Sequence, residues 1–117
     1  MNSTELKQRT KNFALRIIKL SRTIAKTDDA GRVISKQIIR SGTSVAANYR
    51  ATCRARSKAE FIAKIGIVEE EADETALWLE LLAESGILPA GKLSALLQKA
   101  NDLTAIMAAS RKTAAGA

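Results

Sequence analysis

Apolar residues recur at alternating steps of three and four along most of the chain. The first such stripe is formed by Leu6, Thr10, Phe13, Ile17, Leu20 and Ile24. This spacing puts its members on one side of an α-helix. Three further segments repeat the pattern, so we expect helices over about residues 4–26, 30–56, 58–85 and 90–111. Helices of similar length with short connections predict an all-α fold, an antiparallel up-down-up-down four-helix bundle.

Residues that cap helices stand near several of the expected helix ends. One aspartate of the pair Asp28-Asp29 is placed to cap the second helix. Ser57 and Glu60 have the spacing of a capping box at the start of the third helix. Gly86 follows the expected end of that helix and is a natural residue for the position after a helix C-terminus. The connections between the helices are therefore predicted to be short.

The segment Ser41-Gly42-Thr43-Ser44 lies in the middle of the second expected helix, although its residues have poor helix propensity. A loop would normally reset the phase of the apolar stripe. The stripe instead continues through this segment as Ile34, Ile38, Ser41, Val45, Tyr49 and Thr52. We therefore predict one unbroken helix, in which small residues let a neighbouring helix approach closely. A hinge at Gly42 is the alternative.

The composition fits one domain, which we place over residues 1–112, with residues 113–117 expected to be a frayed tail. The chain has 117 residues, one proline and only 3% aromatic residues. No apolar run reaches the roughly 18 residues that a membrane span requires. The single cysteine, Cys53, cannot form an internal disulfide, and the N-terminus lacks an apolar signal segment. We expect a cytoplasmic protein without membrane contact.

The absence of histidine argues against most enzyme classes. It excludes a Ser-His-Asp triad, a Cys-His pair and a zinc site with histidine ligands. The chain has no glycine-rich phosphate loop, and Cys53 is expected to be a buried structural thiol. The acidic run from Glu69 to Glu74 points around most of a helix, which disfavours a metal site. We expect no enzymatic activity, no cofactor and no metal.

Positive charge is concentrated in the first half of the chain. Residues 1–58 contain 14 of the 19 basic side chains and 3 of the 12 acidic ones. On a helical wheel, the basic residues of the second helix fall within an arc of roughly 80°. With two cations of the first helix they form a predicted nucleic-acid-binding set: Arg32, Lys36, Arg40, Arg50, Arg54, Lys58, Lys11 and Arg22. Such a ridge of spaced cations can contact the phosphates of a nucleic acid without reading its base sequence. The alternative is an ordinary solvated face.

A second set of apolar residues lies off the core stripes. A monomer of four helices cannot cover both sides of one helix, so we expect these residues to form the interface of a homo-oligomer. On the first helix this set shares an arc with Lys11 and Arg22, so that helix cannot serve both proposed surfaces in full. The predicted interface residues are Ile67, Leu77, Trp78, Leu81, Leu15 and Ile18.

The run "RSGTSVAANYRATCRARSKAEFIAKIGIVEEEADETALWLELL" resembles the four-helix bundle proteins of the 23S rRNA intervening-sequence family. The resemblance is specific over roughly residues 30–86. One departure is Ala51, where many members of the family have glutamate. The residues that match the family signature are Ser41, Thr43, Ser44, Asn48, Tyr49, Arg50, Glu70 and Glu74.

This resemblance implies a four-helix bundle and, for several members, a ring-like homo-pentamer. Accessory proteins of diversity-generating retroelements are similar in fold and bind nucleic acid and a reverse transcriptase through a basic surface. The family itself has no established activity. From the residues and the resemblance together we predict a non-enzymatic homo-oligomer that binds RNA, or DNA, through a basic face of the first two helices. The alternative is a protein-interaction scaffold or accessory subunit that makes no nucleic-acid contact.

Overall fold

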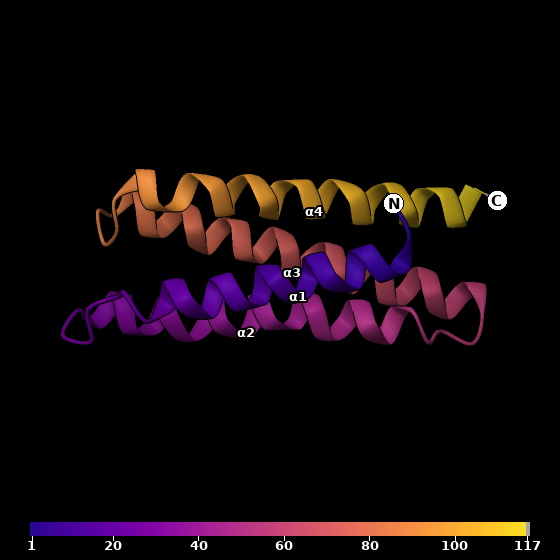
Figure 1. The fold of residues 1–117 in the computed structure, drawn as a ribbon, viewed down its shortest axis with the longest axis horizontal. Helices are drawn as coiled ribbons and strands as arrows, with labels where there is room; N and C mark the ends of the chain where they lie inside the picture. Colours follow the sequence, from indigo (N-terminus) through magenta and orange to yellow (C-terminus); the bar gives the residue numbers. More distant parts are fainter. Residues whose placement is uncertain (117) are drawn as a thin grey trace.

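The computed structural model describes residues 1–116 and contains four α-helices in an elongated bundle (Figure 1). The bundle measures about 48 × 20 × 19 Å along its principal axes. Within the described residues, none of the helices is both long enough and apolar enough to cross a membrane. The helices are α1 (Ser3–Ser21), α2 (Asp29–Thr52), α3 (Lys58–Glu84) and α4 (Ala90–Gly116).

The four helices run alternately up and down, which confirms the predicted antiparallel topology (Figure 1). α1 packs on α2, α2 on α3 and α3 on α4, whereas α1 and α4 contact each other only sparsely. The expected apolar stripes meet in one central core. Its largest fully buried side chains include Phe13, Ile17, Ile38, Ile65, Leu79, Leu82, Leu93, Leu103 and Met107.

α2 continues without interruption through Gly42. The predicted unbroken helix is therefore confirmed, and the alternative of a hinge at Gly42 is wrong. A Cβ atom built on Gly42 would lie 2.9 Å from Cγ2 of Ile17 on α1. Ile17 is itself fully buried. Glycine is therefore required here by the close approach of α1 and not by a turn. The cost of glycine in a helix, about 1 kcal/mol, is accepted because it permits this contact.

The first helix ends at Ser21, five residues before its expected end. The hydroxyl groups of Ser21 and Thr23 donate hydrogen bonds to the carbonyl oxygens of Ile18 and Leu20, at 2.7 Å in both cases. These bonds give side-chain partners to carbonyl oxygens in the last turn of the helix. Ile24 then folds back onto the core and lies against the start of α2. Its burial was predicted correctly, but in a turn and not in a helix.

The caps of α2 and α3 agree with the sequence-based expectation. The side chain of Asp28 accepts a hydrogen bond from the backbone N–H of Gly31 at 2.7 Å. At the start of α3, Ser57 accepts from the N–H of Glu60 at 3.0 Å. These bonds satisfy donors that have no partner inside the helix.

Two other helix ends differ from the prediction. α2 ends at Thr52 and not near residue 56, because the chain must turn before the Ser57 cap. α4 continues to Gly116, five residues beyond the expected end. The segment after residue 111 is rich in alanine, the residue with the highest helix propensity. The predicted frayed tail is thus helical over residues 113–116, and residue 117 lies outside the described residues.

Candidate nucleic-acid interface

The face formed by α1 and α2 contains a hollow of about 480 Å³ that is surrounded by four cations. Lys7 and Lys11 come from α1 and Arg50 comes from the last turn of α2. Arg54 lies two residues beyond the end of α2. The floor is made of small side chains, namely Ala14, Thr43, Ala46 and Ala47. None of the side chains lining this hollow is acidic, so its electrostatic potential favours an anion.

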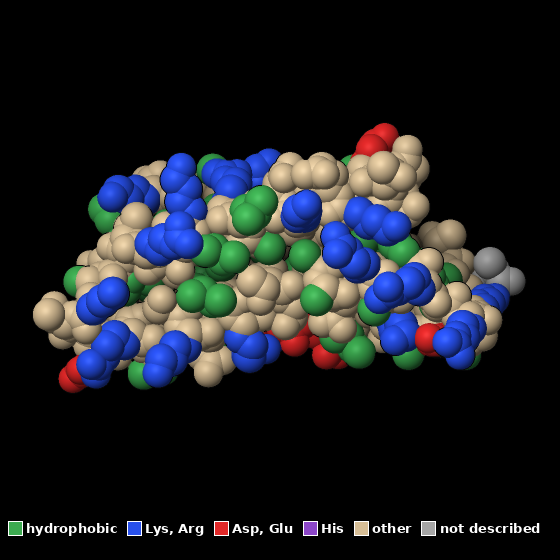
Figure 2. All heavy atoms as spheres, turned by 60° about the horizontal axis from the view of Figure 1, so that its bottom comes forward, with side chains coloured by type: hydrophobic (Ala, Val, Ile, Leu, Met, Phe, Trp, Pro, Cys, Tyr) green, Lys and Arg blue, Asp and Glu red, His purple; other side chains and the backbone are tan. Residues whose placement is uncertain are grey.

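A second hollow, of about 200 Å³, lies at the other end of the α1–α2 face. Arg22 and Lys26 line it from the end of α1 and the turn that follows, and Arg32 and Lys36 line it from the start of α2. Arg32 also forms an exposed ion pair of 2.5 Å with Asp29. In the view that brings this side of the bundle forward, Lys and Arg side chains lie along much of the molecule with hydrophobic atoms between them (Figure 2).

The structure therefore brings together six of the eight predicted nucleic-acid-binding residues in these two hollows. Lys7 and Lys26 complete the hollows and were outside the predicted set. Both belong to the basic first half of the chain, so their charge was visible in the sequence. Their position opposite α2 was not, because it depends on how the two helices pair. The six predicted residues are Lys11, Arg50, Arg54, Arg22, Arg32 and Lys36.

Two of the predicted cations do not belong to these hollows. Arg40 forms ion pairs across the interface with Glu71 and Glu74 of α3, which offset its charge. Lys58 is the first residue of α3, because α2 has already ended at Thr52. The wheel placed it on the α2 arc only by assuming that the helix continued. The predicted single ridge of six residues is thus corrected to two separate basic clusters.

The predicted oligomer-interface residues lie on opposite sides of the bundle. α1 and α3 do not contact each other and occupy diagonal positions. Leu15 on α1 is 55% exposed, and Leu77 and Leu81 on α3 are 47% and 39% exposed. Ile67 on α3 is also exposed, whereas Ile18 on α1 is half-buried. These residues form two separate surfaces of the bundle and not one continuous patch.

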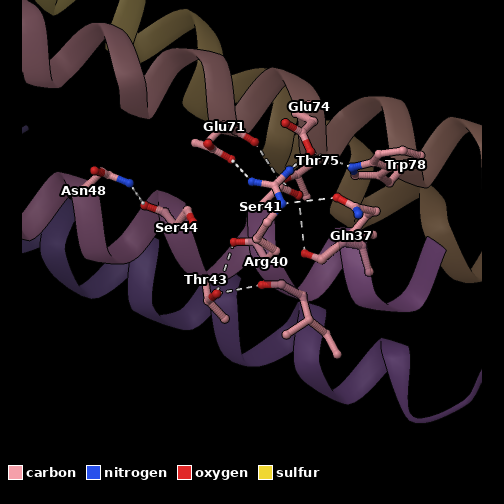
Figure 3. A network of polar contacts seen from close by, with 12 residues as sticks. Gln37, Arg40, Ser41, Thr43, Ser44, Asn48, Glu71, Glu74, Thr75 and Trp78 are labelled. Atoms are coloured by element: carbon pink, nitrogen blue, oxygen red, sulfur yellow. Dashed lines mark hydrogen bonds and ion pairs between the residues drawn. The ribbon is translucent and has the colours of Figure 1, made fainter. Parts of the chain in front are cut away.

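The sequence suggested that Trp78 would be exposed, but its side chain is half-buried. Its indole packs against the hydrophobic core. The indole N–H donates a hydrogen bond of 2.9 Å to Oε2 of Glu74. Glu74 in turn pairs with Arg40, so Trp78 helps to position this ion pair (Figure 3). The indole N–H and part of the ring of Trp78 thus have partners within the chain.

Comparison with known proteins identifies the family. The model of the family described as 23S rRNA-intervening sequence protein matches residues 2–109. The chain belongs to this family. A crystal structure of a protein of unknown function from the S23 ribosomal protein family of Bacteroides thetaiotaomicron is similar, with 32% sequence identity and a TM-score of 0.85. The match covers 96% of this chain and 99% of that one. The search of curated proteins found no match.

In this member of the 23S rRNA-intervening sequence family, the signature residue Ser41 contacts α3 from α2. The hydroxyl groups of Ser41 and Thr75 lie 2.9 Å apart in the buried interface, within hydrogen-bonding distance (Figure 3). Each also lies within reach of a carbonyl oxygen one turn back in its own helix. Within the described residues, no buried side-chain polar atom is left without a partner. The Ser41 position is therefore explained by helix packing.

Other signature residues use their polar groups inside α2. Thr43 donates to the carbonyl oxygen of Ile39 at 2.6 Å, and Asn48 donates to that of Ser44 at 2.9 Å (Figure 3). Both bonds satisfy a side chain within its own helix and leave the α2 backbone helical. Glu70 is exposed on the outer face of α3. None of these contacts requires a ligand.

Tyr49 and Arg50 are neighbours in the signature but serve different surfaces. Burial raises the pKa of the Tyr49 phenol above its ordinary value, and hydrogen bonding with the Cys53 thiol adds to the shift. Tyr49 thus belongs to the core, whereas Cys53, which the sequence predicted to be fully buried, is only half-buried. Arg50 is exposed and lines the larger hollow. Ala51, where the resemblance led us to expect glutamate, places no carboxylate beside the nearby Arg54.

Several acidic residues of α3 form ion pairs with cations. Glu69 accepts a hydrogen bond of 2.8 Å from Nε of Arg111 on α4, and this contact raises the pKa of the arginine. Glu71 pairs with Arg40. Within residues 1–116, no three carboxylate or cysteine side chains come together in a group that could hold a metal ion.

Proposed function

We propose that this protein is a non-enzymatic homo-oligomer that binds RNA, or another nucleic acid, through the α1–α2 face. The observation that supports the proposal is the pair of basic hollows on that face. Eight cations surround them, and the floor of the larger one consists of small side chains that leave room for a phosphate group. Only one of these cations, Arg32, has an ion-pair partner in the described part of the chain.

The chemistry of this face favours recognition of the backbone over recognition of base sequence. Its charged groups are lysines and arginines, which contact phosphates as spaced cations. The only tyrosine, Tyr49, is buried, and no aromatic side chain lines either hollow, so stacking on bases has no platform there. We therefore expect binding with little dependence on sequence.

Self-association would strengthen such binding. Each protomer presents its own α1–α2 face, so an oligomer bound to one RNA molecule gains avidity from an effective concentration of linked sites. Moderate affinity at each hollow then gives firm binding by the assembly. The exposed Leu77 and Leu81, one turn apart on α3, support self-association, because neighbouring large apolar side chains on a protein surface are a feature of interfaces.

The direct test is whether the protein carries nucleic acid when it is purified at low salt. We expect an ultraviolet absorbance ratio typical of bound RNA, which falls to that of free protein after a high-salt wash. Treatment of the bound material with RNase or DNase identifies the polymer. A protein free of nucleic acid at low salt, which also fails to retain added RNA, would contradict the proposal. The exposed α3 strip would then favour the scaffold function.

A further inference from the structure

The contact between α1 and α4 is the weakest in the bundle, and it leaves a seam along the surface. Two hollows, of about 280 and 370 Å³, follow each other along this seam and share Arg16. Their floor is formed by Phe13, Leu20, Leu96 and Leu103 of the core. The other three neighbouring helix pairs are packed much more closely. The seam is thus a shallow groove with an apolar floor.

The rims of the seam carry only positive charge. Arg9, Arg16 and Lys19 line it from α1, and Lys92 and Lys99 line it from α4. None of the residues that line these two hollows is acidic. A fitting occupant would therefore combine apolar side chains, to cover the floor, with carboxylates at both sides.

The outer face of α3 has this combination. Leu77 and Leu81 are exposed there, together with Ile67. Glu70 and Glu84 are exposed on the same side, since positions 70, 77, 81 and 84 recur at steps of seven, four and three. Ile67 to Leu81 spans about 21 Å at 1.5 Å per residue, and the helical part of the α1 rim, from Arg9 to Leu20, spans about 17 Å.

We propose that the outer face of α3 in one copy of the protein docks in the α1–α4 seam of the next copy. This inference rests on the self-association proposed above and adds which surfaces meet. The two surfaces are different, so the contact is head-to-tail and repeats from copy to copy until a ring closes. The exposed leucines of α3 fill the hollows, and its carboxylates lie against the cations of the rims.

This arrangement leaves the nucleic-acid face free. The seam uses the side of α1 that faces α4, whereas the basic hollows lie on the side that faces α2. Lys7 and Lys11 line the larger basic hollow but neither seam hollow. The conflict expected from the sequence, in which α1 could not serve both surfaces, is thereby removed.

Charge reversal on each surface tests the proposal. One variant carries Arg16→Glu and Lys99→Glu in the seam, a second carries Glu70→Lys and Glu84→Lys on α3, and a third carries all four changes. We expect each pair alone to reduce the mass in solution to that of a monomer, by charge repulsion at every contact. The four-change chain has complementary surfaces again and should regain the oligomer. Light scattering at matched protein concentration measures the mass, and circular dichroism confirms that each variant is folded.

The possible outcomes distinguish the proposed contact between α3 and the α1–α4 seam from the proposed self-association in general. If both pairs of substitutions leave the oligomer intact, these surfaces do not meet, although self-association stands. If the pairs dissociate the oligomer but the four-change chain stays monomeric, direct charge pairing between the surfaces is refuted. If the unaltered protein is itself a monomer, both the inference and the proposed self-association fail. Nucleic-acid retention by the unaltered protein is tested separately.

Discussion

Replacing Gly42 with valine is expected to lower the free energy of unfolding by about 3 kcal/mol. The first added carbon would lie 2.9 Å from Ile17, and a branched side chain requires still more space. Ile17 is fully buried among other core side chains and has little freedom to move away. Relief requires α1 to separate from α2, which would disturb the core and the basic hollows together. Urea denaturation followed by circular dichroism measures the change.

Gly91→Val provides a matched control for this substitution. Gly91 also lies in a helix, but a Cβ atom built there meets nothing within 4 Å. Valine has a better helix propensity than glycine, so this variant should be unchanged or slightly more stable. If both variants unfolded at the same urea concentration, the close approach of α1 at Gly42 would be refuted.

Replacing Lys11 and Arg50 together with glutamine is expected to weaken RNA binding about 30-fold or more at low salt. The two residues line the larger hollow from different helices. The substitutions remove two phosphate contacts while both side chains remain polar and exposed, so the fold should be unaffected. Fluorescence anisotropy with a labelled RNA hairpin measures the affinity.

The control variant carries Lys64→Gln and Lys112→Gln, which lowers the net charge by the same amount at positions outside both hollows. We expect this variant to bind within about threefold of the unaltered protein, since only long-range attraction is reduced and salt screens it. Equal losses of affinity in the two variants would mean that total charge, and not the α1–α2 face, determines binding.

The parts of the fold that depend on burial were predictable from the sequence. Steps of three and four identify the buried side of a helix, because a core position is set by local periodicity alone. The prediction of a helix was correct even at Gly42, where the phase of the apolar stripe was a better guide than the poor helix propensity of the local residues. Helix ends were less predictable. α1 ends at Ser21, although its apolar stripe continues to Ile24 in the turn that follows, and Arg111 ties the last turns of α4 to α3 through a contact between distant residues.

The candidate site was predictable only in part, for the same physical reason. The sequence revealed an excess of cations on the first two helices. It could not reveal that Arg40 is neutralised by α3 carboxylates, because that depends on the packing of α2 and α3. The hollows also arise from pairs of helices. Small residues such as Ala46 and Ala47 form a floor only when α1 lies opposite them with its lysines at the rim.

The salt dependence of RNA binding by the unaltered protein tests the account most directly. If the two hollows together engage six or more phosphates, the logarithm of the binding constant should fall against the logarithm of salt concentration with a slope of about −5 or steeper. Affinity should then drop about a thousandfold between 50 and 200 mM salt. A slope near zero, or no binding at the lower salt concentration, would contradict the claim that the α1–α2 face binds the nucleic-acid backbone.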